Sequence, residues 1–311
     1  MNKFVLPEGI KIGHADDCYT GVTCILADKA VGGVSVRGGA PGTRETDMLR
    51  ADKSQGSVDA IVLSGGSAYG LEASCGVVNF LRERNIGFAA GDKIVPLVAQ
   101  AILFDLNTPN EYHYPDKAMG YAAAANAQSS DIKFGRVGAG KGATVGKILG
   151  MQCACRSGIG GATLMFDDLI VSAVVAVNAV GDVFDHRSGN VIAGARTPDG
   201  KFLNAAECLT NGVLAARMKS AVTANLKESS GKNTTIGCVV TNAKLDKVYA
   251  NKLAAISHDG FAMSIRPVHT DADGDTMFAL SKGDKVIDFS IVAALAAEAT
   301  AFAIENAVTV K

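Results

Sequence analysis

The sequence predicts an α/β fold in which a β-sheet core lies between layers of helices. Short apolar runs rich in β-branched residues alternate with Ala-rich segments whose apolar residues recur at helical spacing. Several of the β-branched runs are apolar throughout, which is typical of strands covered on both faces. The chain has 311 residues, 48% of them hydrophobic, so it is long enough to bury a sizeable core. Helices on both sides of a sheet account best for this pattern.

The first half of the chain predicts three strands and two helices. The third strand enters a Gly-rich turn, Ser64–Ser67, after which apolar residues follow a helical pattern that ends near Asn85. An Ala-rich segment further on indicates the second helix. In order, these are strands over 22–27, 31–37 and 60–63 and helices over 68–84 and 118–127.

The second half predicts several buried strands and three more helices. Between Gly160 and Phe184, β-branched runs separated by Asp167-Asp168 and Gly181 indicate buried strands or a hairpin. A polar stretch over 226–233 then ends abruptly where a strongly apolar strand begins. The remaining elements are helices over 204–219, 254–265 and 289–308, a strand over 234–241 and an extended segment over 277–281.

Charge and hydropathy argue against nucleic-acid and membrane binding. Thirty Lys and Arg residues against 31 Asp and Glu give a net charge of −1, without the basic excess that phosphate binding requires. The longest apolar runs, 169–177 and 291–303, are shorter than a membrane-spanning helix, and Glu298 interrupts the second. The N-terminal sequence lacks the apolar core of a signal peptide. We therefore expect a cytoplasmic protein.

Cysteine and histidine spacing gives no indication of a metal site. The seven cysteines include no C-x-x-C pair, and the five histidines show no H-x-x-x-H spacing. We interpret the cysteines as reduced, small apolar residues and the histidines as surface or hydrogen-bonded structural residues. No metal and no cofactor are expected.

Two Gly-rich segments resemble functional motifs only in part. Gly135–Gly142 matches G-x-x-x-x-G-K, but Gly142 stands where a phosphate loop has the Ser or Thr that holds Mg²⁺. Ser67 follows a strand and precedes a helix, but a nucleophile elbow needs glycine where Tyr69 stands. Nucleotide binding at the first segment remains an alternative, and a hydrolase acting through Ser67 is weakly supported.

The junction between Asn233 and Thr234 is the third candidate. A polar segment stops at a threonine that opens a buried strand, which suits an N-terminal nucleophile released by self-cleavage. The freed α-amine, with an ordinary pKa of about 8, can act as the base for the hydroxyl of the same residue. On this pattern alone, a loop that enters a strand is the commoner interpretation. Thr235 is a second candidate for the new terminus.

Six sequence blocks in order resemble the self-processing L-aminopeptidase/D-Ala-esterase family, which includes β-peptidyl aminopeptidases and the nylon-oligomer (6-aminohexanoate oligomer) endohydrolase. They cover most of the chain from residue 36 to residue 280. The Asn-Thr pair is closer to the nylon-oligomer branch than to members with serine at the cut. The blocks are Val36–Glu45, Leu63–Glu72, Val95–Leu106, Val137–Lys147, Asn233–Gly237 and Asp273–Leu280.

The resemblance implies an αββα sandwich of the N-terminal-nucleophile type, also seen in ornithine acetyltransferases. It further implies a single domain, 1–311, cut into a large chain, 1–233, and a small chain, 234–311. Processed pairs would assemble into a homo-oligomer, a tetramer. The expected substrate is a peptide or another small molecule with an amide bond.

The resemblance also assigns roles to individual residues. Thr234 is the expected nucleophile, released by cleavage after Asn233. Asn178 would donate to the oxyanion, a role whose loss costs about 10²–10³-fold in rate. Of Asp273 and Asp275, one would orient the α-ammonium and the other would assist proton transfer. Lys147 would stabilise developing charge, and Tyr69 would lie near the substrate.

These residues predict a self-processing hydrolase of amide bonds that forms an acyl-enzyme on the threonine. The first alternative is an acyltransferase of the ornithine acetyltransferase type, which would pass the acyl group to an amine. The second is a non-catalytic nucleotide-binding protein. One position departs from the family pattern, because Lys141 stands where many members have a small hydroxyl residue. A cation there would alter the charge of the pocket.

Overall fold

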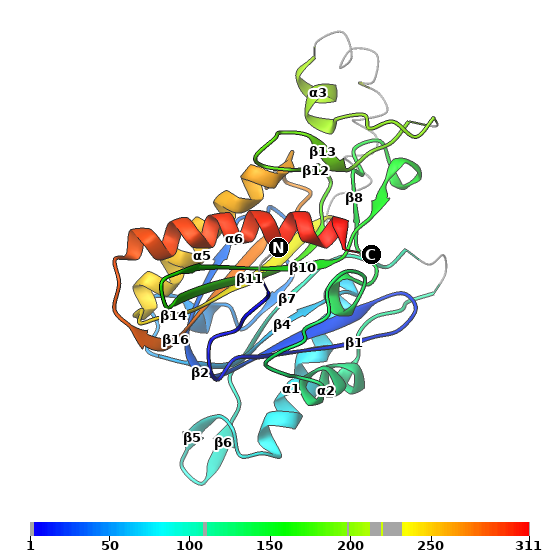
Figure 1. The fold of residues 1–311 in the computed structure, drawn as a ribbon. Coiled ribbons are helices and arrows are strands. Elements are labelled where there is room, and N and C mark those ends of the chain that lie inside the picture. Colours follow the sequence, from blue (N-terminus) through cyan, green and yellow to red (C-terminus); the bar gives the residue numbers. More distant parts are fainter. Residues whose placement is uncertain (1–2, 108–110, 198, 212–218, 220–231, 311) are drawn as a thin grey trace.

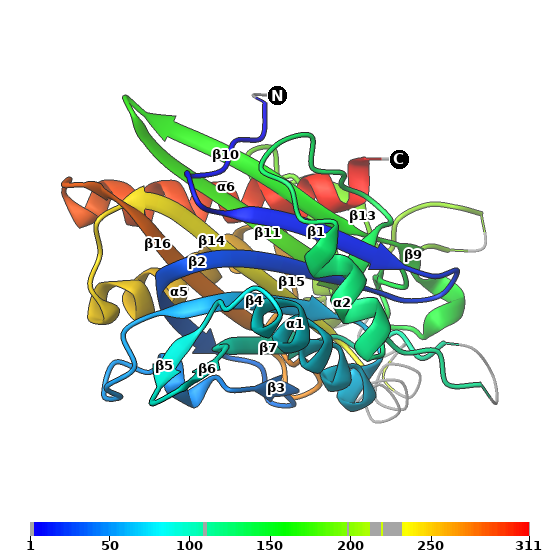
Figure 2. The same cartoon turned by 90° about the horizontal axis from the view of Figure 1, so that it is seen from below.

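Four layers stack in the order helices, sheet, sheet, helices (Figure 1). The structure is a computed structural model that describes residues 3–107, 111–197, 199–211, 219 and 232–310. The view from below shows one helical layer in front of the strands and the other behind them (Figure 2). Both the predicted α/β class and the αββα sandwich are confirmed.

One long strand, β2 (Gly21–Val36), belongs to both sheets. Its first part pairs with β1 (Lys11–Asp16) and β4 (Val58–Ser64), and its second part pairs with β16 (Thr276–Lys285). Between these parts the pairing register shifts, and Asp28 and Lys29 adopt positive φ angles of 43° and 60°. This irregularity lets one strand leave the first sheet and enter the second.

The strand that opens at the predicted cleavage site lies inside the second sheet. This strand, β14 (Thr234–Ala243), runs antiparallel to β11 (Leu169–Asn178) and parallel to β16. The full order is β10-β11-β14-β16-β2-β4-β7-β3, with β1 beside β2. The strands not yet given bounds are β10 (Ile159–Phe166), β7 (Val98–Ile102) and β3 (Thr43–Arg44).

The helices cover the outer faces of the two sheets. On one side α5 (Lys247–Ser264) and α6 (Phe289–Thr309) pack on the β10–β16 sheet, and on the other α1 (Ala73–Arg82) and α2 (Lys117–Ala125) pack on the β1–β7 sheet. Side chains alternate accordingly along the strands. Val175 of β11 lies in the core beneath the helices, whereas Val174 lies in the core between the sheets.

Helix α6 is long and apolar enough to cross a membrane by length and composition alone. It has 21 residues and a mean hydropathy of 1.5, and 56% of that span is buried inside the fold. The sequence analysis predicted the helix over 289–308 but compared only its apolar stretch 291–303 with the length of a membrane span. Its buried residues, among them Val292, Ala296 and Ile304, pack against the sheet, as expected of a core helix.

The predicted strands and helices are confirmed where the structure describes them, with differences at their ends, except that the strands predicted over 22–27 and 31–37 are two parts of one strand, β2. The segment after β4 begins as a 3-10 turn, Ser67–Glu72, before α1 starts. Helix α5 starts at Lys247, seven residues before the predicted start at residue 254, because Asp246 accepts a hydrogen bond from the Tyr249 N–H and caps the helix there. Of the predicted helix over 204–219, α3 covers Ala205–Thr210 and most of the remainder lies outside the described residues, as does the polar stretch up to residue 231.

The sequence analysis missed two strands of the first sheet, β1 and β7. Both carry polar residues in their interior, such as His14 in β1 and Gln100 in β7, so neither forms an uninterrupted apolar run. Short elements complete the fold: β5 (Phe88–Ala90), β6 (Lys93–Val95), β8 (Thr144–Val145), β9 (Cys155–Arg156), β12 (Asp182–Phe184), β13 (Val191–Ala193), β15 (Ile265–Arg266) and 3-10 turns at Asp47–Leu49, Gly138–Gly140 and Met151–Cys153.

Two glycines bring the backbones of α1 and α2 into direct contact. A Cβ at Gly120 of α2 would lie 1.9 Å from the carbonyl oxygen of Ala73, and one at Gly76 of α1 would lie 2.0 Å from that of Lys117. Because backbone atoms cannot move aside as a flexible side chain can, any larger residue must push the helices apart.

We expect Gly120→Ala to lower the free energy of unfolding by about 1–3 kcal/mol, the usual cost of overpacking, although alanine is the better helix former. Chemical denaturation measures the change. Gly56→Ala is the matched control, since Gly56 is exposed and a Cβ there meets no atom within 4 Å. Equal stabilities of the two variants would show that the helices are not in tight contact.

Candidate active site

The predicted cleavage site lies at the buried start of β14. Asn233 is fully buried and Thr234 is 2% exposed. Asn178, the last residue of β11, stands directly opposite Thr234 in the antiparallel pairing. The fold thus places the expected nucleophile and the expected oxyanion donor side by side, in the middle of a sheet rather than at its edge.

The segment 273–275 surrounds the Asn233–Thr234 peptide bond. The Gly274 N–H donates to the Asn233 carbonyl oxygen at 2.9 Å, and the Thr234 hydroxyl donates to the same oxygen. Asp275 Oδ1 accepts the Thr235 N–H at 2.7 Å. The carbonyl on one side of this bond is therefore held by two donors, one of them the hydroxyl that would attack it.

Glycine is required at position 274. A Cβ there would lie 2.6 Å from the Thr234 hydroxyl oxygen and 2.8 Å from the carbonyl oxygen of Ala40. The Ala40 N–H in turn donates to the Asp273 carbonyl at 2.8 Å. The resembling block Val36–Glu45 thus helps to position the 273–275 segment through its backbone.

Lys147 and Asn178 bind one another and share a further acceptor. Lys147 Nζ donates to Asn178 Oδ1 at 2.8 Å, to the Asn178 carbonyl at 3.0 Å and to the Lys232 carbonyl at 3.4 Å. Asn178 Nδ2 donates to the Phe104 carbonyl at 2.8 Å and to the Lys232 carbonyl at 3.3 Å. Both donors therefore reach the carbonyl one residue before Asn233.

The ammonium of Lys147 is buried against neutral acceptors. Its residue is only 4% exposed, and three carbonyl or amide oxygens surround Nζ, which matches the three N–H donors of the charged form. Burial lowers the pKa of Lys147 to about 7, while the charges of Asp273 and Asp105 oppose this effect. Lys147 is thus poised to change charge near neutral pH.

The two predicted aspartates are held differently. Asp275 contacts the junction, as described above, whereas Asp273 Oδ2 accepts the N–H and the hydroxyl of Thr270 at 2.9 and 2.5 Å. Burial and, next, the charge of Asp275 raise the pKa of Asp273. The carboxylates are therefore close enough to repel one another, but only Asp275 binds the strand that follows the cleavage site.

Sequence reasoning gave no role to His269 or Asp105, which both lie in this region. His269 Nδ1 lies 2.8 Å from Asp275 Oδ2, so the histidine orients that carboxylate. Asp105 is buried beside Phe104, accepts the Gly66 N–H at 2.6 Å, and has its pKa raised to about 7 by burial. The sequence could have indicated Asp105, because this aspartate follows directly on an apolar segment within the block Val95–Leu106.

Tyr69 lies outside this buried cluster. It is 54% exposed, on the turn that follows β4, and its ring contacts other tyrosines rather than the junction. The predicted place near a substrate is therefore a surface position.

The Gly135–Gly142 segment does not present a phosphate site. Asp16 Oδ2 accepts the Gly138 N–H at 2.9 Å, and Asp16 Oδ1 lies 3.0 Å from Lys141 Nζ. A carboxylate of the protein thus occupies the loop N–H and the lysine that an anion would need. The same ion pair uses Lys141, the position that departs from the family pattern.

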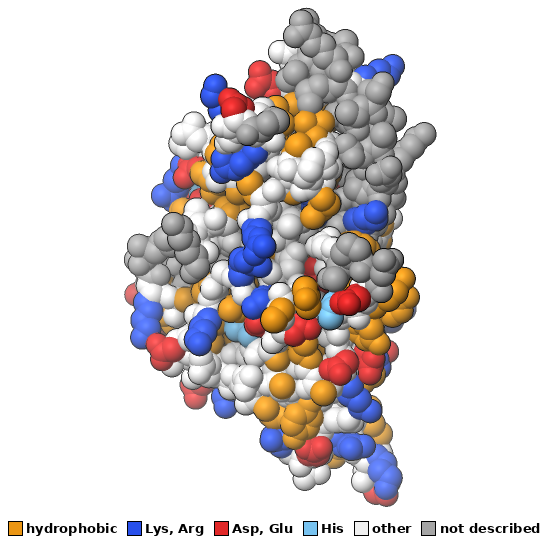
Figure 3. Space-filling model, turned by 90° about the vertical axis from the view of Figure 1, so that its right-hand side faces the viewer, with side chains coloured by type: hydrophobic (Ala, Val, Ile, Leu, Met, Phe, Trp, Pro, Cys, Tyr) orange, Lys and Arg blue, Asp and Glu red, His pale blue; other side chains and the backbone are white. Residues whose placement is uncertain are grey.

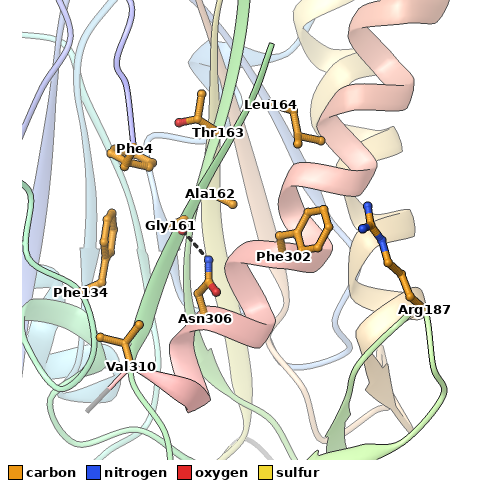
Figure 4. Close-up of a pocket in the computed structure, with 10 residues that line it drawn as sticks. All are labelled: Phe4, Phe134, Gly161, Ala162, Thr163, Leu164, Arg187, Phe302, Asn306 and Val310. Atoms are coloured by element: carbon orange, nitrogen blue, oxygen red, sulfur yellow. Dashed lines mark hydrogen bonds between the residues drawn. The ribbon is translucent and has the colours of Figure 1, made fainter. Parts of the chain in front are cut away.

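A pocket elsewhere on the molecule is apolar and contains none of the predicted site residues. It lies between β10, α6 and Phe4, has a volume of about 500 Å³, and is crossed by a hydrogen bond from Asn306 Nδ2 to the Gly161 carbonyl (Figure 4). Within the described part of the chain, no group of three His, Cys, Asp or Glu residues is arranged to hold a metal ion.

Lys147 makes stability depend on pH in a defined direction. Its ordinary pKa is 10.5 and its folded pKa is about 7, so between these values the unfolded chain binds more protons and the free energy of unfolding rises with pH. From pH 7.5 to 9.5 we expect a rise on the order of 2 kcal/mol. Denaturant titration of the Thr234→Ala chain measures it, and adding Lys147→Met should remove it. Lys244→Met, at an exposed lysine, is the control, and an unchanged slope in Lys147→Met would contradict the assignment.

Two solved structures show the same fold. The L-aminopeptidase D-Ala-esterase/amidase of Ochrobactrum anthropi, described as a variant of the Ntn hydrolase fold, aligns over 99% of this chain and 87% of its own, with a TM-score of 0.69 and 16% identity. A β-aminopeptidase of Burkholderia sp. aligns over 97% of this chain and 84% of its own, with a TM-score of 0.65 and 19% identity.

Sequence comparison identifies the family. An uncharacterized aminopeptidase of Mycobacterium leprae is 36% identical over 302 residues, 91% of this chain and 79% of the relative. The 6-aminohexanoate-oligomer endohydrolase of Agromyces sp. is 33% identical over 287 residues, 90% of this chain and 75% of the relative. The profile of peptidase family S58 matches residues 7–310. The chain therefore belongs to peptidase family S58 and is a hydrolase.

Proposed function

We propose that this hydrolase cuts its own chain between Asn233 and Thr234 and then uses Thr234 to cleave amide bonds in other molecules. One observation carries the proposal: the Asn233 carbonyl oxygen is held by the Gly274 N–H and by the hydroxyl of Thr234. A buried carbonyl needs a donor in any fold, but here the second donor is the hydroxyl of the expected nucleophile itself.

Self-cleavage proceeds in two steps. The Thr234 oxygen attacks the Asn233 carbonyl carbon, the peptide C–N bond breaks, and an ester forms while the proton passes to the new α-amine. The Gly274 N–H stabilises the negative oxygen of the tetrahedral intermediate. Water then hydrolyses the ester, which leaves a carboxylate on Asn233 and a free hydroxyl on Thr234.

The released terminus becomes the catalyst for a substrate amide. The α-amine of Thr234 takes the proton of its own hydroxyl as that oxygen attacks, and it returns a proton to the leaving amine as the amide C–N bond breaks. Water then hydrolyses the acyl ester, which releases the acid and restores the Thr234 hydroxyl. In the uncut chain Lys147 and Asn178 donate to the carbonyl of residue 232. When the new C-terminus of the large chain moves away after cleavage, these donors become free. These donors then bind the oxygen of the substrate acyl group, while Asp275, held by His269, keeps the start of β14 in place.

Peptides and amide-linked amino compounds are the proposed substrates. The relatives described above include aminopeptidases and an endohydrolase of 6-aminohexanoate oligomers, and both activities break an amide bond. We also propose a single domain that yields the chains 1–233 and 234–311, assembled as a homotetramer of processed pairs in the cytoplasm.

Intact-mass analysis of the purified protein tests self-cleavage. We expect a small chain of 78 residues, about 8 kDa, and a large chain of about 24 kDa from the 31.9 kDa precursor. Thr234→Ala should remain whole and inactive, because no hydroxyl is left to attack. Thr235→Val is the matched control: this neighbour is equally buried, and its loss should leave cleavage intact. Cleavage of Thr234→Ala would refute the proposed nucleophile.

Asn178→Asp tests the proposed oxyanion donor. The substitution keeps the oxygen that accepts from Lys147 and Thr144 but replaces the donating amide nitrogen, so kcat on an amide substrate should fall by about 10²–10³-fold. The assay compares water with ornithine as acceptor. For the wild-type protein, release of the free acid supports a hydrolase, whereas faster acyl transfer to ornithine would support the acyltransferase alternative.

A further inference from the structure

Strand β10 stands at one end of the strand order, and most of its outer edge is open. On its inner side β10 pairs with β11, and on its outer side Gly135 pairs with Ile159, the first residue of the strand. Ile159 exchanges both backbone hydrogen bonds with Gly135, so the backbone groups of every second residue after it also point outward. These residues are Gly161, Thr163 and Met165. Among the described residues, no strand pairs with this outward side after Ile159.

The apolar pocket of about 500 Å³ lies along this open edge and is lined from both faces of the sheet. Phe4 and Phe134 belong to the core between the sheets, whereas Phe302 comes from α6 on the outer face (Figure 4). Ala162 of β10 lines the pocket on the side of α6, and its small side chain leaves space there. An edge with apolar groups on both faces suits an additional strand, because alternate side chains of such a strand point to opposite faces.

The far end of β10 has the side chains that such an added strand needs. Met165 and Phe166 are 52% and 53% exposed, and as consecutive residues of a strand they point to opposite faces. The strand contains neither a charged residue nor a proline, the features by which edge strands usually avoid pairing. On the face shown in Figure 3, by contrast, charged side chains of both signs interrupt the hydrophobic ones. The edge of β10 is therefore apolar and unprotected.

The two ends of β10 also carry opposite charge. Asp167 is exposed in the turn that follows the strand, whereas Arg136 and Arg156 are exposed near its beginning. Burial and then the charge of Arg156 lower the pKa of Arg136, so the two cations lie close together. Within the described part of the chain, neither arginine has an ion-pair partner. A strand antiparallel to β10 brings its end to the beginning of β10, so an identical strand would place the aspartate near the arginines.

We propose that β10 pairs antiparallel with β10 of a second copy of this chain about a two-fold axis, which makes the sheets of the two copies continuous. Phe166 of each copy stands opposite Ala162 of the other, so its ring enters the pocket. In this pairing Leu164 lies on the axis beside its own counterpart, and each copy offers the same surface to the other. The inference rests on the proposed homo-oligomer, for which it gives the contact surface, and it does not depend on the catalytic residues.

Light scattering of the purified protein tests the contact through the mass of the assembly, about 128 kDa for a tetramer of the 31.9 kDa chain. A tetramer built from two kinds of two-fold contact separates into dimers when one kind is lost. We expect Phe166→Lys to halve the wild-type mass, because a lysine at a strand edge opposes pairing. Phe88→Lys is the matched control: Phe88 is 52% exposed on β5, and this variant should keep the wild-type mass.

A cysteine at position 164 tests the pairing directly. Leu164 directs its backbone groups to β11, so across the axis it forms a pair without hydrogen bonds, with Cα atoms about 4.5 Å apart. This distance lies within the range of a disulfide. Under mild oxidation Leu164→Cys should join two large chains through a reducible bond. The wild type, in which Cys18 is exposed elsewhere, should not.

The outcomes separate this inference from the function proposed above. A wild type with the mass of a single chain would overturn the homo-oligomer and this inference together, whereas self-cleavage and hydrolysis have their own tests. An oligomer that Phe166→Lys leaves unchanged would overturn this inference alone and leave the edge to a strand of another protein. Absence of the cross-link in Leu164→Cys would overturn the pairing about that residue. Denaturing intact mass should show full self-cleavage in every variant, which establishes that each one folds.

Discussion

The burial of the Asn233–Thr234 peptide bond at the start of an interior strand is the constraint on which the rest of the site depends. A buried carbonyl needs donors, because its desolvation is otherwise uncompensated. The parallel neighbour β16 supplies one through the segment just before it, since Gly274 donates to Asn233 and Asp275 accepts from Thr235. The antiparallel neighbour β11 ends in Asn178, opposite Thr234. Ordinary strand pairing therefore assembles the groups around the bond.

Charge is arranged around the same point at a cost to stability. Lys147 is buried with neutral acceptors, and the charges of Asp273 and Asp105 act on it without a direct hydrogen bond. Each of these groups is displaced from its ordinary pKa in the direction that burial dictates. Such a cluster is poorly explained as a stabilising device, because buried charges without direct partners destabilise a fold. Strongly displaced pKa values are instead typical of sites that transfer protons.

The apolar strands and helices could be predicted from the sequence, but contacts between residues distant in the sequence could not. Strands such as β11 and β14 are mostly apolar and rich in β-branched residues, so their positions followed from the pattern. The double membership of β2 did not, since it depends on positive φ angles at Asp28 and Lys29, which are not glycines. The two-sheet architecture and the role of Asn178 came from the family resemblance, whereas the residue pattern already made the junction a candidate. His269 escaped notice because its contact with Asp275 depends on the conformation of the segment between them rather than on a motif.

In the proposed mechanism the uncut chain also acts as a template for the substrate site. Two sets of donors are distinct: Gly274 serves the carbonyl of Asn233, whereas Lys147 and Asn178 serve that of Lys232. The first set is positioned for the bond that the chain breaks in itself. The second set is satisfied by the Lys232 carbonyl until the new C-terminus of the large chain moves away after cleavage, so these donors are ordered before a substrate binds. Self-cleavage happens once in each chain, whereas the same threonine must then act repeatedly on other amides. Repeated catalysis therefore requires donors that are already in place when self-cleavage is complete.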